Sequence, residues 1–263
     1  MRLVDLMRMT NIPPSPALTG IVRRFTIVET AEEATCTLIP EAGFLLGFRY
    51  RGSSALLHGD CATPVANYSV TGMRDHARYM STAAGSGALV VNFREGGAGI
   101  LLRVPLDRLF TATVDLSEFI SLEEIEQLSR DMESAHDDAA RVAVVETLLL
   151  MRLRTPFSNA MVMAAIRAMR AARGAIVVRS MAKALGVSQD RLEKQFRRFV
   201  GATPKQYCSI LRFRNALASA NPQTRFTDIA VEAGYYDQSH FIREFRSVTG
   251  MTPRQFFREN MFC

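Results

Sequence analysis

The stretch Met181-Ala-Lys-Ala-Leu-Gly186 recurs 48 residues further along the chain as Ile229-Ala-Val-Glu-Ala-Gly234. After one inserted residue the match continues, and Gly201-Ala-Thr-Pro204 aligns with Gly250-Met-Thr-Pro253. Repeats of about 20–50 residues are typical of repeat arrays. Only two copies are present here, so the repeat indicates a duplicated supersecondary motif, and this motif decides the fold of the C-terminal part of the chain.

The first copy predicts a short helix, a tight turn and a second helix. The short helix begins at about Val178 and ends at Gly186, because a glycine just past a helix favours the left-handed C-terminal cap. Ser188 is a good N-cap for the second helix, which runs to about Val200. Apolar residues at helical spacing give this helix one buried face, formed by Leu192, Phe196 and Phe199.

The second copy repeats this pattern. Thr227 is expected to cap a short helix that ends at Gly234, and Asp237 is expected to cap the helix that follows. The buried stripe of that helix is formed by Phe241, Phe245 and Val248. A short helix, a turn containing glycine and a second helix make up the helix-turn-helix unit, whose second helix lies in the major groove of DNA.

The charge of the chain, +6 in total, is divided unevenly. Residues 1–155 contain 15 Arg, no Lys and 19 Asp or Glu, whereas residues 156–263 contain 17 Lys or Arg and 7 Asp or Glu. The second segment therefore has a net charge of +10, which attracts polyanions such as nucleic acid. Pro156 interrupts any helix at the boundary, so we expect an acidic N-terminal domain and a basic C-terminal domain.

Basic residues lie opposite the apolar stripes of the two second helices. A step of about 100° per residue from each stripe selects the outward-facing residues, most of which are basic. They are Asp190, Lys194 and Arg197 in the first copy and Ser239, Arg243 and Arg246 in the second. Two ordinary helical hairpins in an all-α core are the alternative, but such hairpins need not place basic residues opposite the apolar stripe.

The second copy carries the pattern Ile229-Ala-x3-Gly234-Tyr, then Ser239-x-Phe241-x-Arg243-x-Phe245-Arg246-x3-Gly250-x-Thr-Pro253-x2-Phe256. This pattern resembles the signature of the AraC/XylS transcription regulators, and the first copy is similar to that family's first helix-turn-helix. The resemblance covers roughly Asn159 to Arg258. It implies seven helices, with a long one from Pro204 to about Ala220 joining the two modules, and it matches Arg212 and Arg214 to basic positions of the family.

We expect the two recognition helices, Ser188 to Val200 and Asp237 to Val248, to enter successive major-groove faces about one DNA turn, roughly 34 Å, apart. Arginine and lysine read guanine or hold phosphate, and glutamine can read adenine. The expected DNA-binding residues are Gln189, Asp190, Arg191, Lys194, Arg197, Gln238, Ser239, His240, Arg243 and Arg246.

The first recognition helix departs from the family in its charge. Asp190 and Glu193 stand where many members have neutral or basic groups. A carboxylate can accept a hydrogen bond from cytosine N4, but near phosphate it costs affinity. We therefore expect the second module to read bases more directly than the first.

The N-terminal half predicts a small β-rich domain followed by a pair of helices. Glycine and proline separate short strand-like runs, at residues 21–28, 35–39, 44–50, 88–93 and 100–104. Ser121-Leu-Glu-Glu124 fits a capping box that opens a helix, and a second helix runs from about Asp137 to Leu153. Residues 87–105, with Gly96-Gly97-Ala98 before Leu101-Leu-Arg-Val-Pro105, resemble a poorly characterised sensor-type domain attached to a subset of these regulators.

The expected fold is α+β: a small β-rich domain with a helical pair, followed by an all-α seven-helix domain with two helix-turn-helix motifs. The expected boundaries are 1–155 for the effector or dimerisation domain and 156–263 for the AraC-type DNA-binding domain, with helix-turn-helix motifs at about 178–200 and 227–249 and a linker helix at about 204–220.

The N-terminal half shows no enzyme motif. Gly85-Ser-Gly87 and Gly96-Gly-Ala-Gly99 lack the Lys and Ser or Thr of a phosphate loop and are interpreted as turns. His58, Cys61 and His76 lie at no metal-ligand spacing and are more simply structural. We expect no catalytic residue, no metal and no cofactor.

The four cysteines, Cys36, Cys61, Cys208 and Cys263, form no C-x-x-C pair and are typical of a reduced cytosolic protein rather than a disulfide framework. No apolar run of about 20 residues is present that could span a bilayer. We therefore expect a cytoplasmic protein without a membrane partner.

The sequence favours a DNA-binding transcription regulator, not an enzyme, that acts on double-stranded DNA under the control of a small effector or of dimerisation. A ligand-independent regulator with a purely structural N-terminal domain, and an enzyme targeted to DNA by this module, are the alternatives. The sequence does not decide whether RNA polymerase is a partner, which effector binds, or whether the protein activates or represses transcription.

The helix from Asp137 to Leu153 carries a narrow apolar seam, formed by Val142, Val145, Leu149 and Leu153. Two copies of a helix can share such a seam in a dimer. The same seam can instead pack on the β-rich domain of its own chain. The sequence leaves both readings open.

Overall fold

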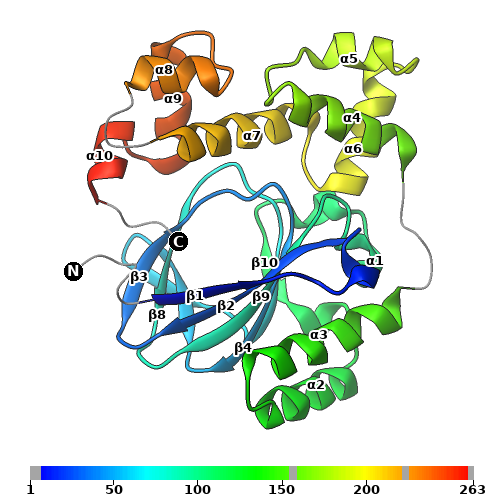
Figure 1. The fold of residues 1–263 in the computed structure, drawn as a ribbon, viewed down its shortest axis with the longest axis vertical. Coiled ribbons are helices and arrows are strands. Elements are labelled where there is room, and N and C mark those ends of the chain that lie inside the picture. Colours follow the sequence, from blue (N-terminus) through cyan, green and yellow to red (C-terminus); the bar gives the residue numbers. More distant parts are fainter. Residues whose placement is uncertain (1–6, 154–158, 221–224, 260–263) are drawn as a thin grey trace.

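The computed structural model describes residues 7–153, 159–220 and 225–259 of the chain. A β-rich N-terminal part lies against a layer of helices that forms the C-terminal part (Figure 1). Two further helices, α2 (Leu122–Ser134) and α3 (Asp138–Arg152), cover the β-rich part on the side away from that layer. The predicted α+β order, with strands first and the helical domain second, is therefore confirmed.

Two antiparallel sheets build the β-rich part. The larger has the order β1-β2-β9-β4-β7-β10, with bounds Met7–Ile12, Val22–Thr30, Gly87–Phe93, Leu45–Arg51, Tyr68–Thr71 and Thr113–Asp115. The smaller has the order β3-β8-β5-β6, with bounds Ala34–Leu38, Arg78–Thr82, Ser54–His58 and Cys61–Pro64. Short 3-10 turns connect them, at η2 (Pro16–Leu18), η3 (Leu106–Leu109) and η4 (Leu116–Glu118).

The core of this part lies under the long central strands. Leu46 and Phe48 in β4, and Leu89 and Val91 in β9, are buried and alternate with less buried neighbours, as the two-residue period of a strand requires. The runs expected at 21–28, 35–39, 44–50 and 88–93 coincide with β2, β3, β4 and β9. The remaining strands gave no such signal; β6, for example, is exposed at every residue.

The strand expected at residues 100–104 is wrong. Gly99–Leu102 forms the short helix α1, and all four of its residues are buried. A short apolar run that is buried on every side has no periodicity that separates a strand from a helix. Arg103, with φ +52°, adopts the left-handed conformation that ends this helix.

The two helices expected after the strands are present. Ser121 and Glu124 form the predicted capping box at the start of α2, and Asp137 caps α3 by accepting a hydrogen bond from the N–H of Ala140 (2.7 Å). The apolar seam of α3 is buried in the core of its own chain, where Val145 and Leu149 are fully covered. The reading of this seam as a dimer interface is therefore wrong, and the intrachain reading holds.

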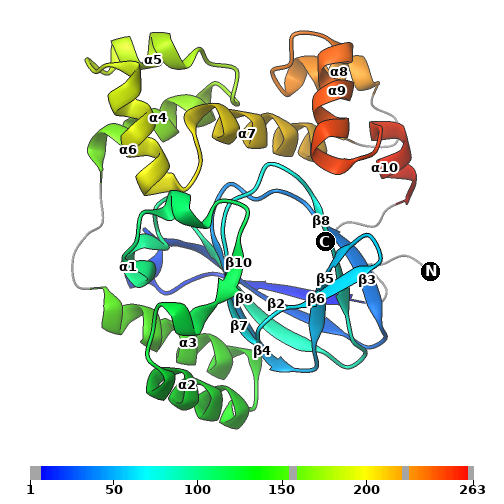
Figure 2. The same ribbon diagram turned by 180° about the vertical axis from the view of Figure 1, so that it is seen from behind.

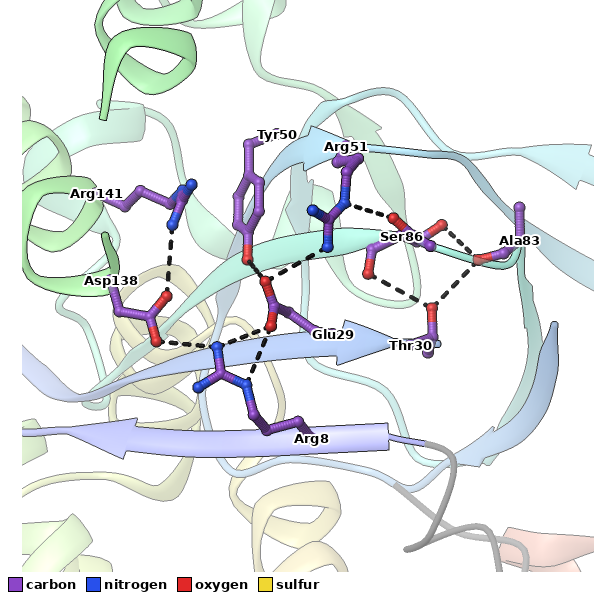
Figure 3. A network of polar contacts seen from close by, with 10 residues as sticks. Arg8, Glu29, Thr30, Tyr50, Arg51, Ala83, Ser86, Asp138 and Arg141 are labelled. Carbon is purple, nitrogen blue, oxygen red and sulfur yellow. Dashed lines mark hydrogen bonds and ion pairs between the residues drawn. The ribbon is translucent and has the colours of Figure 1, made fainter. Parts of the chain in front are cut away.

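A polar network on the larger sheet fixes the start of α3 (Figure 3). Asp138 pairs with Arg8 of β1 (3.1 Å), and Arg8 pairs with Glu29 of β2 (2.8 Å). The guanidinium carbon of Arg141 lies 4.1 Å from the centroid of the Tyr50 ring in β4. These contacts hold α3 on the sheet from its polar side, in addition to the apolar seam.

Helices α4 to α10 form the described C-terminal part, which agrees with the seven helices that the family resemblance implies. Their bounds are Ala160–Ala171, Val178–Ala184, Gln189–Val200, Pro204–Ser219, Phe226–Glu232, Gln238–Thr249 and Pro253–Glu259. The predicted cap Thr227 is wrong, because the N-cap of α8 is Arg225, two residues earlier, and the Thr227 hydroxyl donates to the Asp228 side chain (3.3 Å). Ser188 and Asp237 cap α6 and α9 as predicted.

The described residues form two large separate apolar cores, beside a small cluster of Met7, Ala34 and Cys36. The larger core joins the β-rich part to α4, α5, α6 and the first half of α7, from Leu18 to Leu211. The smaller core lies among the second half of α7, α8, α9 and α10, and includes Phe213, Phe241 and Phe245. The two helix-turn-helix motifs therefore belong to different cores.

Candidate nucleic-acid interface

The first recognition helix, α6, presents one polar face to solvent. Ser188 starts the helix by accepting a hydrogen bond from the Arg191 N–H (3.2 Å). Five of the predicted contacts are exposed on it: Gln189, Asp190, Arg191, Lys194 and Arg197. Glu193 is half-buried and accepts a hydrogen bond from Gln189 (2.8 Å), so this acidic residue is occupied within its own helix.

The second recognition helix, α9, has the same arrangement. Asp237 accepts a hydrogen bond from the His240 N–H (2.6 Å), which satisfies one of the free donors at the helix start. Four predicted contacts are exposed: Gln238, Ser239, Arg243 and Arg246. Phe241 and Phe245, on the opposite face, are fully buried. The outer faces predicted from the 100° step are thus the solvent faces of both helices.

His240 differs from the other predicted contacts. Its ring is half-buried, with its centroid 5.4 Å from that of Tyr235 in an edge-on contact. Its Nε2 atom lies 3.3 Å from the Glu244 carboxylate, one turn further along α9. The side chain of His240 is therefore held within its own module.

Both recognition helices meet the β-rich part at their C-terminal ends. Gly201, which caps α6 with φ +94°, lies so close to Phe44 that a Cβ there would come within 2.5 Å of the ring. The carbonyl of Val248, in the last turn of α9, accepts a hydrogen bond from the Ala77 N–H (2.7 Å). The N-terminal ends of α6 and α9 point away from the β-rich part, at opposite ends of α7 (Figure 2). In helix-turn-helix proteins these N-terminal residues contact base edges.

Two exposed side chains beside the recognition helices were not predicted. Tyr236 is 92% exposed in the turn that leads into α9, and Arg198 is exposed next to Arg197. A tyrosine hydroxyl and a guanidinium both bind phosphate oxygens. The signal for Tyr236 was its position immediately before the N-cap Asp237, because a turn residue at that place cannot enter the apolar stripe.

The two arginines of α7 that match family positions are occupied inside the molecule. Arg212 donates two hydrogen bonds to Glu244 of α9 (3.0 Å each) and one to the Gly174 carbonyl (3.0 Å). Arg214 pairs with Glu41 of the β-rich part (2.7 Å). Both side chains therefore hold α7 to its neighbours.

A buried carboxylate connects the β-rich part to α4 and α7, the helices on either side of the first helix-turn-helix. Glu95, whose side chain is 6% exposed, accepts hydrogen bonds from the Tyr207 hydroxyl (2.6 Å), from Arg170 and from Arg23 (3.4 Å). Burial alone would raise the pKa of Glu95, but the hydrogen bonds from Tyr207 and Arg170 hold it below its ordinary value. This network keeps Glu95 ionised and ties α4 and α7 to the sheets.

The β-rich part also encloses a cavity of about 150 Å³ between its two sheets. Its walls come from both sheets and are largely apolar, with Arg49, Arg74 and Arg78 among the lining residues. Apolar pockets with a few polar groups are the usual binding sites of small molecules. The sequence did not reveal this cavity, because its residues are scattered over eight strands and the loops between them.

The residues considered for metal binding or nucleophilic chemistry do not assemble. His58 and Cys61 face each other across the β5–β6 hairpin, whereas the His76 ring contacts Asp75 (3.1 Å) in another loop. Within residues 7–153, 159–220 and 225–259, no three His, Cys, Asp or Glu side chains gather as a metal site. Cys61 is exposed and Cys208 is buried, and both are free thiols.

In the described part of the chain, every helix falls short of the length and apolar character that crossing a bilayer requires.

The similar solved structures cover either nearly the whole chain or about two fifths of it. The solved structure of ToxT from Vibrio cholerae is 10% identical, covers 97% of this chain and 98% of its own, and has a TM-score of 0.49. ToxT with a bound unsaturated fatty acid is 12% identical, with coverages of 90% and 95% and a TM-score of 0.48. An AraC-type transcriptional regulator from Chromobacterium violaceum is 24% identical, covering 38% of this chain and 91% of its own, with a TM-score of 0.34.

No curated protein matches the chain. Residues 181–259 match the model of a family described as a helix-turn-helix domain. These residues comprise α5 from its fourth residue through α10, and so include both motifs of the duplication. Residues 181–259 of this chain are therefore similar to a helix-turn-helix domain.

Proposed function

We propose that this protein is a transcription regulator that reads a specific DNA sequence with α6 and α9 and responds to a small effector bound in its β-rich part. The observation that carries this proposal is the common orientation of the two recognition helices. Both are fixed at their C-terminal ends and present their capped, exposed N-terminal ends away from the β-rich part. One duplex can then contact both helices.

In this proposal some exposed residues of α6 and α9 contact bases and others contact the DNA phosphates. Arg243 and Lys194 occupy equivalent positions of the repeat and read guanine or hold phosphate. Gln238 reads adenine, and Asp190 accepts from cytosine N4. The two contacts lie about one DNA turn, roughly 34 Å, apart. Arg191, Arg197, Ser239 and Arg246 hold the backbone, and Tyr236 joins them.

The proposed division of labour places effector binding in residues 1–155 and DNA binding in residues 156–263. The cavity between the sheets supports the first assignment, since it is the kind of apolar pocket that takes a small molecule. The +10 charge of residues 156–263 supports the second. A regulator of this kind acts where the chromosome is, in the cytoplasm, and alters transcription by RNA polymerase.

Selection of duplexes from a random pool by the full-length protein tests the proposal. We expect an enriched sequence with two conserved segments spaced by about one helical turn. Arg243→Ala should lose the preference in one segment, whereas Arg130→Ala, at an exposed arginine of α2, should leave both intact. Recovery of a random pool, or of a single segment with the unchanged protein, would contradict the two-helix mode of reading.

A further inference from the structure

The helix α7 runs from the first helix-turn-helix motif to the second and packs into both apolar cores (Figure 1). Long helices curve, and a bend in α7 changes the direction of α9 relative to α6. A second contact between the two motifs removes that freedom. The turn Arg173-Gly174-Ala175 makes such a contact. It comes shortly after α4, a helix that packs in the same core as the first motif.

The 173–175 turn lies along one face of α7. Arg212 donates a hydrogen bond to the Gly174 carbonyl (3.0 Å), and the Asn215 amide donates to the Arg173 carbonyl (3.2 Å). Gly174, with φ +81°, lies so close to α7 that a Cβ there would come within 2.5 Å of the Cys208 carbonyl oxygen. Positions four and three residues apart share one face of a helix, so the turn follows α7 over about two helical turns.

The same turn contacts the second motif where α8 leads into α9. The Arg173 guanidinium donates to the carbonyl of Glu232, the last residue of α8 (3.2 Å). A Cβ on Gly234, the turn glycine with φ +85°, would lie 2.9 Å from the Ala175 Cβ. The first motif lacks this contact, because no atom of the described residues, apart from chain neighbours, lies within 4 Å of a Cβ on its equivalent glycine, Gly186.

Arg212 joins the 173–175 turn to the second recognition helix. Besides the Gly174 carbonyl, its guanidinium binds the Glu244 carboxylate of α9 through two hydrogen bonds (3.0 Å each). Glu244 also accepts a hydrogen bond from the Ser209 hydroxyl of α7 (2.5 Å). Paired hydrogen bonds between arginine and a carboxylate fix the geometry of both groups. A displacement of the turn is therefore passed to α9.

The placement of two recognition helices decides which duplexes both can contact. One extra base pair between two DNA segments displaces the second by about 3.4 Å and rotates it by about 35° around the duplex. Rigidly placed helices must deform such a duplex, which costs free energy. We propose that the 173–175 turn sets the direction and separation of α9 relative to α6, and thereby the number of base pairs that the protein prefers between its two recognised segments. The DNA part of this inference rests on the proposed function.

Distances between the two motifs test the proposal without DNA. Spin labels replace Arg198 and Ser247, which are exposed at equivalent positions of α6 and α9. They are introduced as an unnatural amino acid, so the native cysteines stay unchanged, and pulsed electron spin resonance of the full-length protein measures the distances between them. Gly234→Ala should shift the distance distribution, because its Cβ meets Ala175.

Gly186→Ala is the matched control for Gly234→Ala. Both glycines have positive φ, +69° and +85°, so both substitutions carry the same kind of backbone strain. Only the Cβ at Gly234 meets the 173–175 turn among the described residues. An unchanged distance distribution in Gly234→Ala, or an equal shift in Gly186→Ala, would overturn the positioning role of the turn.

Ala175→Gly supplies the rescue. Combined with Gly234→Ala, it removes the atom that lies 2.9 Å from the new Cβ. The next atom, the Arg173 carbonyl oxygen, lies at 3.7 Å, which is an ordinary van der Waals distance. We therefore expect the double variant to regain the distances of the unchanged protein. A double variant that keeps the shifted distribution would assign the shift to another cause and overturn the role of Ala175.

Duplexes with altered spacing extend the measurement to DNA. The two segments selected by the unchanged protein are kept, and one base pair is added or removed between them. We expect the unchanged protein and Gly186→Ala to prefer the selected spacing about tenfold over its neighbours, Gly234→Ala to reduce that preference to about threefold or less, and Ala175→Gly to restore it in the double variant. An unaltered preference in Gly234→Ala would overturn the effect on DNA. If the label distances shift as expected but the unchanged protein selects no duplex, the proposed function is wrong and the positioning role of the turn stands.

Discussion

The two helix-turn-helix motifs come from one duplicated sequence, but they are joined to the β-rich part in different ways. The first shares its apolar core with the sheets, and the buried Glu95 ties the adjacent helices α4 and α7 to them through Arg170 and Tyr207. The second has a core of its own and meets the sheets through the loop residues Ile39 to Glu41 and Ala77. The two copies of the motif therefore differ in how firmly they are attached: the first through a shared apolar core and the second through a few loop contacts.

This difference indicates which module can respond to the β-rich part. Moving the first motif would expose a continuous apolar core, whereas moving the second would break a few polar contacts at loops. α7 packs into both cores and so spaces the two recognition helices, while the second attachment restrains the end of α9. It also follows that residues 1–155 or 156–263 alone would each expose half of a shared core, so the experiments below use the full-length chain.

The largest expected effect is on the attachment of the first motif. Glu95→Ala leaves Arg23 and Arg170 without their buried partner, and we expect it to lower the free energy of unfolding by about 3 kcal/mol. Glu41→Ala removes the more exposed pair with Arg214 at the second attachment and should cost about 1 kcal/mol or less. Urea unfolding of both variants measures the difference. Equal losses would contradict the distinction between the two attachments.

The Glu95 carboxylate also makes the free energy of unfolding depend on pH. The pKa of Glu95 lies below its ordinary value of 4.5 in the folded protein, so the unfolded chain binds the proton more readily. The stability that Glu95 contributes is therefore complete above about pH 4.5 and is lost as the pH falls through the folded pKa. The difference in unfolding free energy between the unchanged protein and Glu95→Gln should shrink below pH 4.5. A difference that is constant from pH 7 to pH 3 would exclude this linkage.

Two glycines at equivalent positions of the repeat compare the attachments directly. Gly201 and Gly250 both cap a recognition helix with positive φ, so replacement by alanine costs each about 1 kcal/mol in backbone strain. A Cβ at Gly201 would also overlap the Phe44 ring, at 2.5 Å, whereas nothing lies within 4 Å of one at Gly250.

Gly201→Ala should therefore destabilise the protein by about 1–3 kcal/mol more than Gly250→Ala, as overpacking of a core does. Thermal unfolding of the two variants under the same conditions makes the comparison. If Gly250→Ala proved as destabilising as Gly201→Ala, the first module could not be the more tightly docked one.

The sequence predicted the duplicated module better than the domain that it is attached to. The caps Ser188 and Asp237 and the apolar stripes were correct because helix ends and helical faces are set by residues close in the sequence. The helix at Gly99–Leu102 was mistaken for a strand because burial on every side removes the periodicity. Thr227 was predicted as the N-cap because threonine is a preferred N-cap residue. The helix in fact begins after Arg225, which has no side-chain cap.

In the candidate site, too, the sequence predicted what depends on helical spacing but not what depends on contacts between distant residues. The exposure of Arg243 and Lys194 follows from their helical spacing, and the sequence predicted it. The roles of Arg212 and Arg214 do not follow from spacing, because their partners Glu244 and Glu41 are distant in the chain. The cavity was not predictable from spacing either, because it is formed by residues of two sheets that are distant in the sequence. Contacts between distant segments carry no local signal.

Arg243→Ala and Lys194→Ala compare DNA reading by the two modules. If Arg243 makes a bidentate contact to guanine, its loss should weaken binding to the selected duplex by about 1–3 kcal/mol and relax the preference at that base pair. Lys194 stands between Asp190 and Arg197 on a face with a carboxylate, so its loss should weaken all duplexes by a smaller and more uniform amount. Fluorescence anisotropy with selected and scrambled duplexes measures both. A sequence-independent effect of Arg243→Ala would rule out base reading there.

The smallest expected difference concerns Arg191 and His240, which are equivalent in the repeat but not in surroundings. Arg191 is exposed on α6, whereas the His240 ring is half-buried against Tyr235 and lies 3.3 Å from Glu244. An exposed arginine that neutralises a phosphate releases a counterion, so Arg191→Ala should reduce the slope of log K against log salt concentration by about 1. His240→Ala should leave that slope unchanged and instead lower stability slightly. Salt titrations of DNA binding separate the two, and a reduced slope in His240→Ala would place this histidine on the phosphate backbone after all.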